Sequence, residues 1–519
     1  MKPTSKSLAL LGIPLLLAYS MFPSSVLAHG YVERFSPSLP LGWYLTAAGA
    51  AVTLSFVVSH LIARFPDTKP TFPSYSFNIG QLRFNSNVYL IAAFSWRLIV
   101  LILQIMSVTL FGLTIWAGFA GDQSAIHNFA PTFVWVIFWV GIPIVCALLG
   151  NVWRLLNPWE NIFKAVEATY HRVPALLPHS PLAQYKTGWG VWPAIILFLM
   201  FAWIENIYPD SILPSHLATT VVIYSIITWT GMFIFGCEIW LYYGDPFSVL
   251  FRLLSRCSFV EPCTLSLTHC RNCLESCHTP DKECRDCVTC FTRSSWKLRS
   301  FRIRIFGSGV TQGTNASVTV TIFILLVLST MTLDGFFATT IWSDLRRQLL
   351  ALLPNITLIG SVALLAAPIL FYLVYQIFMS LTAHLGRMSE TGHSTGKMFA
   401  ITLLPIAVSY HIAHFHYFLI VQGQAIIPLM SDPLGLGWDL FGTADYRINV
   451  TVLAPNASWL VTVIIIVAGH IIAVYAAHSI TRRQFGASPG LIRGQTAVLG
   501  LMTGYTVLSL WVMGQPMMR

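Results

Sequence analysis

Cysteine is concentrated in one stretch of this chain, between residues 257 and 290. The stretch reads THCRNCLESCHTPDKECRDCVTC in its second half and contains cysteines at C-x-x-C spacing. A C-x-x-C turn lets two thiolates converge on one ion, and two such pairs supply a tetrahedral site. The sequence therefore predicts a bound metal, with these candidate ligands: Cys270, Cys273, Cys277, Cys284, Cys287 and Cys290.

The spacing leaves zinc and an iron–sulfur cluster open as the bound group. Cys284, Cys287 and Cys290 match the start of the ferredoxin run C-x-x-C-x-x-C-x-x-x-C-P, but the fourth position, residue 294, is serine. A cluster would therefore need a remote fourth ligand, either Cys277 or Cys263. Free thiols or a disulfide knot are the remaining alternative.

A second group of candidate ligands consists of histidines within apolar segments. In SYHIAHFHYFLIVQGQ, His411 and His414 have i, i+3 spacing and share one helix face, and His470 lies in another apolar segment. Neutral imidazoles bind zinc and similar divalent metals, so these three histidines predict a metal site inside the membrane. His29, if cleavage makes it the N-terminus, would supply a further ligand. Alternatively, each histidine makes an interhelical hydrogen bond.

Three carboxylates are candidates for a catalytic base or for support of that metal. Asp432 and Asp439 lie in the long polar segment that follows the histidine-bearing run, and Glu205 lies near the end of an earlier apolar run. Segments of this kind often carry function, although a solvated connector is the simpler interpretation.

The elements that position these residues are membrane helices. The chain of 519 residues is 55% hydrophobic and 10% charged, with a mean hydropathy of +0.68, whereas a soluble domain has about 25% charged residues. The composition predicts an all-α, polytopic membrane helix bundle. We expect ten spans after the N-terminal signal, at residues 43–63, 95–119, 131–152, 188–207, 217–243, 317–336, 356–380, 398–421, 457–478 and 495–514.

The first 28 residues resemble a secretory signal peptide. Lys2 and Lys6 precede a short apolar run, and small residues at Val26 and Ala28 fit a cleavage site that would leave His29 outside the cytoplasm. The alternative is an uncleaved first span. The predicted organisation is a signal (1–28), membrane helices 1–5 (29–243), a Cys-rich basic loop (244–316) and membrane helices 6–10 (317–519).

The net charge of +10 follows membrane topology and does not indicate nucleic acid. Lys and Arg concentrate in alternate loops, and the positive-inside rule places those loops on the cytoplasmic side of the membrane. Thiols there are kept reduced, so metal ligation is favoured over disulfides. The predicted cytoplasmic loops are residues 64–94, 153–187, 244–316, 381–397 and 479–494.

Several long blocks of the chain resemble bacterial integral membrane proteins known as fenitrothion hydrolases. These blocks are VLAHGYVERF, NVWRLLNPWE, GWGVWPAIILFLMFAWIENIYP, YGDPFSVLFRLLSR, LDGFFATTIW and FHYFLIVQGQAIIPLMSDPLGLGWDLFGTADY. The resemblance implies a bacterial inner-membrane protein that hydrolyses an aryl phosphorothioate ester and releases a nitrophenol. The expected partners are membrane lipid and a small hydrophobic ester substrate. The corresponding loop of that family is basic and not cysteine-rich, so the cysteine cluster looks like an addition.

Three hypotheses of function remain. The first is a metal-dependent phosphotriester hydrolase, in which a bound ion lowers the pKa of its water. The second is a non-hydrolytic membrane protein that handles metal or electrons. The third is an assembly subunit whose segment 257–290 docks a cytoplasmic redox or structural partner. The sequence contains no phosphate-binding loop, G-x-S-x-G elbow or H-E-x-x-H motif, which argues against an ATP-driven transporter, a serine hydrolase and a zinc protease.

Overall fold

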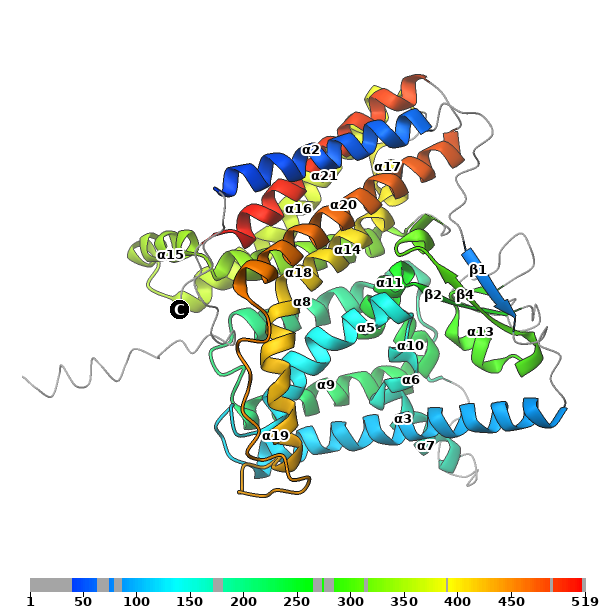
Figure 1. Cartoon of the computed structure of the whole chain (residues 1–519), viewed down its shortest axis with the longest axis vertical. Helices are drawn as coiled ribbons and strands as arrows, with labels where there is room; N and C mark the ends of the chain where they lie inside the picture. The colour runs from blue at the N-terminus through cyan, green and yellow to red at the C-terminus, as the bar shows by residue number, and fades with distance from the viewer. Residues whose placement is uncertain are drawn as a thin grey trace, which may run out of the picture.

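The fold is a bundle of membrane-spanning helices with a small β-sheet at one end (Figure 1). The structure, a computed structural model, describes residues 40–62, 74–78, 86–170, 181–264, 273–274, 284–311, 316–388, 391–485 and 489–515. Ten helical segments within these ranges are long and apolar enough to cross a membrane. The protein is therefore a multi-pass membrane protein, as the composition predicted. The predicted signal peptide and His29 lie outside the described residues.

The spans agree closely with the apolar runs in the sequence, because hydropathy and length are local properties of a segment. The predicted run 188–207, for example, forms a segment from Thr187 to Asn206. The long helical elements are α2 (Leu41–Ile62), α3 (Ser86–Ala120), α4–η2–α5 (Phe129–Leu149), α8 (Trp192–Asn206), α9 (Pro214–Phe235), α14 (Val318–Phe337), α16 (Ile356–Gly386), α17–η7–α18–η8–α19 (Gly392–Ser431), α20 (Pro455–Phe485) and α21 (Pro489–Met513).

One predicted run, 217–243, is broken into two helices. Helix α9 ends before Gly236, whose φ of 90° is readily adopted only by glycine. The chain then turns into α10 (Cys237–Tyr243). The next short helix, α11 (Pro246–Leu254), is capped by Asp245, whose carboxylate accepts a 2.8 Å hydrogen bond from the backbone N–H of Ser248.

The sheet joins two segments that are far apart in the sequence. Four antiparallel strands follow the order β1-β4-β2-β3. In the register of the sheet, Ser74 lies opposite Arg304 and Val260 lies opposite Ile303. The strand from the loop after α2 therefore forms one edge of the sheet. The strands are β1 (Ser74–Asn78), β2 (Val260–Thr264), β3 (Cys284–Arg285) and β4 (Arg299–Arg304).

The sheet and the short helices around it occupy one end of the bundle. Figure 1 shows β1, β2, β4 and α13 (Val288–Arg293) at this end, and α15 (Thr340–Leu352) at the opposite end. The most enclosed spans are α14 and the segment Gly392–Ser431, which are 72% and 89% buried over their most apolar windows. These two segments therefore form the interior of the bundle, and the other spans expose more apolar side chains, as lipid-facing helices do. Two further short helices, α6 (Trp153–Leu156) and α7 (Pro158–Tyr170), follow α5.

Candidate metal centre

Three of the predicted cysteine ligands come together beside the sheet. The Sγ atoms of Cys273, Cys287 and Cys290 all lie within 4.8 Å of one another, and the Sγ atoms of Cys273 and Cys287 are 3.4 Å apart. Cys287 and Cys290 are buried, whereas Cys273 is half-buried. Among the described residues this is the one group of three or more His, Cys, Asp or Glu side chains with metal-ligand geometry.

Helix α13 holds two of these thiols in place. Cys287 is the N-cap residue of this helix, and its Sγ accepts a 3.4 Å hydrogen bond from the backbone N–H of Cys290. A cap normally uses a side-chain oxygen for this contact, and a thiolate acceptor would be stabilised by the same donor. The C-x-x-C spacing therefore forms a single helical turn with both sulfur atoms on one side.

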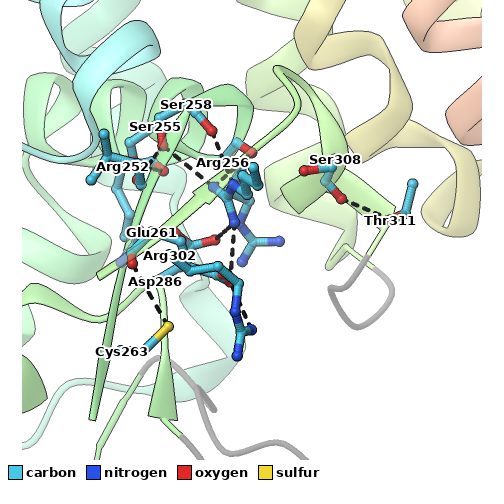
Figure 2. Close-up of polar contacts among 12 residues, drawn as sticks. Arg252, Ser255, Arg256, Ser258, Glu261, Cys263, Asp286, Arg302, Ser308 and Thr311 are labelled. Carbon is cyan, nitrogen blue, oxygen red and sulfur yellow. Dashed lines mark hydrogen bonds and ion pairs between the residues drawn. The ribbon is translucent and has the colours of Figure 1, made fainter. Parts of the chain in front are cut away.

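The residue before Cys287 is fixed by a buried ion-pair network (Figure 2). Asp286 adopts a positive φ of 57° and its backbone N–H donates to the carbonyl of Pro262. The Arg304 guanidinium lies 2.6 Å from Asp286 Oδ2 and 3.1 Å from Glu261 Oε1. It also donates to the carbonyl oxygens of Ser258 and Arg256, at 2.9 and 3.2 Å. Arg304 thus ties the turn before Cys287 to strands β2 and β4.

The charges in this network compensate one another. The side chains of Arg304 and Glu261 are 1% and 0% exposed, and Arg302 adds a second cation 3.4 Å from Glu261. Buried charges persist only when they are paired and hydrogen-bonded. The pKa of Arg304 is raised: burial opposes its charge, but the facing carboxylates of Asp286 and Glu261 outweigh that effect.

Three described cysteines of the same stretch lie outside the thiol group. Cys257 and Cys263 are buried in the β2 region, and burial raises the pKa of both thiols, that of Cys257 to about 12. They are therefore neutral thiols at physiological pH. Cys284 is disulfide-bonded and is not a member of the group. Cys270 and Cys277 lie outside the described residues.

The thiol group opens onto a polar cleft at the end of the spans. Cys273 and Cys290 line one wall of this cleft, α6 and α7 line another, and α10 and α11 line a third. The cleft therefore joins the cysteine region to two of the sequence blocks described above, NVWRLLNPWE and YGDPFSVLFRLLSR.

Ion pairs connect the walls of the cleft. Glu238 of α10 lies 2.5 Å from Arg293, at the end of α13, and 3.8 Å from Arg154 of α6. Arg154 also lies 3.3 Å from Glu160, which in turn lies 2.5 Å from Lys164. Glu238 therefore links the helix that carries Cys290 to the membrane bundle.

The predicted histidine ligands lie within the spans but do not share one site. His411 Nε2 lies 3.2 Å from the carbonyl oxygen of Val140, and His470 Nδ1 lies 2.8 Å from that of Ile466. His414 Nε2 lies 2.8 Å from Asp334 Oδ2, and the two side chains are 6% and 9% exposed. Each histidine thus faces a different partner, and the intramembrane metal site stays a prediction.

The three predicted catalytic carboxylates are dispersed. Asp432 accepts hydrogen bonds from the backbone N–H groups of Leu436 and Gly437, at 2.9 and 2.7 Å. Asp439 accepts one from Ala444 at 3.0 Å, so both aspartates stabilise turns of the polar segment. Glu205 lies at the end of α8 beside Asn206. Their proposed catalytic roles stay predictions.

The sequence did not indicate the arginines and glutamates of the cleft as a group, because they come from separate helices. Arg154, Glu160 and Arg252 fall within the two blocks named above, whereas Glu238 and Arg293 lie outside both. The chain matches no protein-family model, and no curated protein and no solved structure is significantly similar to it.

Proposed function

We propose that this membrane protein binds a metal through Cys273, Cys287 and Cys290 and handles metal or electrons at the sheet end of the bundle. The convergence of these three sulfur atoms within 4.8 Å carries the proposal. Thiolates are soft ligands that select zinc, copper(I) or iron–sulfur clusters. The N–H of Cys290 directed at Cys287 Sγ is the kind of hydrogen bond that tunes such a centre.

Access to the centre supports an active role over a purely structural one. Structural zinc sites are closed by four protein ligands, whereas sites that react keep one position open. The three described thiols supply three ligands, and two of them line the cleft. A fourth ligand from Cys270 or Cys277 would close the site. Separate substitution of these two residues distinguishes a closed, four-ligand site, which would lose metal in one of the variants, from an open, three-ligand site, which would keep it in both.

Metal analysis of the purified protein tests the proposal. We expect about one zinc ion, or iron with sulfide and absorbance near 400 nm, per chain, and loss of the metal in Cys287→Ser and Cys290→Ser. Cys237→Ser is the matched control, because Cys237 is a half-buried free thiol outside the group. Metal-free wild-type protein, or equal metal in all the variants, contradicts the proposal.

A second candidate is the phosphotriester hydrolase implied by the resemblance, acting within the spans. The buried pair of His414 and Asp334 supports it, because a carboxylate that orients an imidazole is a common arrangement for a general base. If this pair is the base, His414→Gln lowers release of the nitrophenol from an aryl phosphorothioate by roughly 10²-fold or more. His127→Gln, an exposed histidine between two spans, is the control, and no release by the wild type rejects this candidate.

A further inference from the structure

The residues that line the cleft beside the thiol group carry a net positive charge. Arg154, Arg252 and Arg293 line it, together with two carboxylates, Glu160 and Glu238. Three arginines thus face two carboxylates across the cleft, and the excess of positive charge favours an anionic ligand. Lys164, outside the lining, lies 2.5 Å from Glu160 and offsets part of its charge.

Two of the arginines are held in place before any ligand arrives. The Arg252 guanidinium lies 3.6 Å from the centre of the Tyr242 ring and donates a 3.0 Å hydrogen bond to the Tyr242 carbonyl. Arg154 is held between Glu160 and Glu238 and is 19% exposed. Such preorganisation lowers the entropy lost on binding.

One residue of the cleft wall holds a buried hydrogen-bond donor. Trp153 is 5% exposed and lines the cleft, and its indole Nε1–H has no hydrogen-bond partner among the described residues. A buried N–H without a partner costs free energy. The side-chain oxygen of Asn151, also on this wall, is buried and likewise has no hydrogen-bond donor within the described ranges. The wall of the cleft therefore contains two buried polar atoms whose hydrogen bonding is not satisfied within the described part of the chain.

We propose that this cleft binds a phosphate group, contacted by Arg154, Arg252 and Arg293. One arginine is enough for the two oxygens of a carboxylate, whereas three arginines from three elements suit a tetrahedral group with several acceptor oxygens. The phosphate group belongs either to a free phosphate compound or to a lipid headgroup. A headgroup can reach the cleft because α5 ends at Leu149, next to the first cleft residues. This proposal rests on the proposed function in one respect, because the thiol group forms one wall of the cleft.

Glu238 competes with the ligand for the same arginines. Its carboxylate lies 2.5 Å from Arg293 and 3.8 Å from Arg154 and is 37% exposed. A phosphate group that contacts both arginines must take the place of this carboxylate. Removing the charge of Glu238 therefore strengthens phosphate binding, whereas loss of a merely structural ion pair would weaken it or leave it unchanged.

Calorimetric titration of the purified, metal-analysed protein with inorganic phosphate tests the site. We expect binding that weakens at least tenfold in Arg252→Gln and in Arg293→Gln and tightens severalfold in Glu238→Gln. Arg347→Gln is the control, because Arg347 is exposed on α15 at the opposite end of the bundle, and it should bind phosphate as the wild type does.

The same titration in lipid nanodiscs separates the two sources of the phosphate group. If a headgroup is the ligand, phosphatidylglycerol nanodiscs suppress phosphate binding and phosphatidylcholine nanodiscs do not. If a free compound is the ligand, both bind phosphate equally. Metal-bearing protein that binds no phosphate in detergent or in either nanodisc, or equal affinity in the two arginine variants and the wild type, overturns the inference. Phosphate binding by a protein that holds no metal overturns the proposed metal centre alone.

Discussion

At the scale of single residues, the position of the thiol group depends on Arg304 more than on the cysteines themselves. Asp286 precedes Cys287 and adopts a positive φ of 57°, a conformation that few non-glycine residues occupy. Arg304 holds it there while also pairing with Glu261. The network has no signature in the sequence, because its three members are separated along the chain and meet only when the sheet forms.

Replacing Arg304 with methionine should therefore cost both stability and metal. Removal of one partner from a buried ion pair costs roughly 3–5 kcal/mol, because here it leaves the Glu261 carboxylate buried with one cation fewer. We expect a lower unfolding temperature and reduced metal content in Arg304→Met. In Arg302→Met, which removes a pair at 3.4 Å with a partly exposed arginine, the loss should be smaller. Equal losses in the two variants would show that Arg304 has no special role.

The reactivity of the buried cysteines should depend on pH in a defined direction. Burial raises the pKa of Cys257 to about 12, and only the thiolate reacts with iodoacetamide. Because the shift is upward, at pH 8 the thiolate fraction is on the order of 10⁻⁴. The rate of alkylation of Cys257 should then rise about tenfold for each pH unit above pH 8. Mass spectrometry of alkylated, folded protein is expected to show Cys257 unmodified at pH 8, and Cys273 modified once a chelator has removed the metal. Rapid alkylation of Cys257 at pH 8 would contradict the prediction that this thiol is buried and neutral.

At the scale of elements, the break between α9 and α10 creates the third wall of the cleft. The Trp240 ring of α10 packs against two glycines, one on α9 and one at the end of α10. A Cβ at Gly231 would lie 2.3 Å from the ring, and one at Gly244 would lie 2.5 Å from it. These close contacts place α10 against α9 and so set the position of Glu238. Hydropathy alone predicted one continuous span here, because it does not register the positive φ of Gly236.

A single methyl group at Gly231 should therefore displace α10. Overpacking of this kind costs roughly 1–3 kcal/mol, and we expect Gly231→Ala to lower the unfolding temperature and to weaken phosphate binding. Gly504→Ala is the matched control, since Gly504 lies in the span α21 and a Cβ there meets nothing within 4 Å. A helical alanine is favoured over glycine, so the control should be as stable as the wild type or more stable. The idea fails if the two variants melt alike.

At the scale of the whole molecule, the sequence was informative about the membrane spans and much less so about the sheet. Each span is a local run of apolar residues, so its length and position could be predicted directly. The sheet instead depends on pairing between Ser74 and Arg304, two positions separated by several spans, and its strands are short. The C-x-x-C spacing predicted that thiols converge, but it did not indicate the cleft, whose walls come from separate helices.

The orientation of the molecule is the last prediction, and the chemistry of the thiol group depends on it. The positive-inside rule places the sheet end in the cytoplasm and the segment after α19 outside. Two exposed threonines, Thr292 beside the cysteines and Thr451 in that segment, are suitable positions for single cysteine probes. In intact spheroplasts, a membrane-impermeant maleimide should label Thr451→Cys, and it should label Thr292→Cys only after permeabilisation, with wild-type labelling subtracted. The opposite pattern would place the thiols on the oxidising side, where disulfides are favoured over a metal.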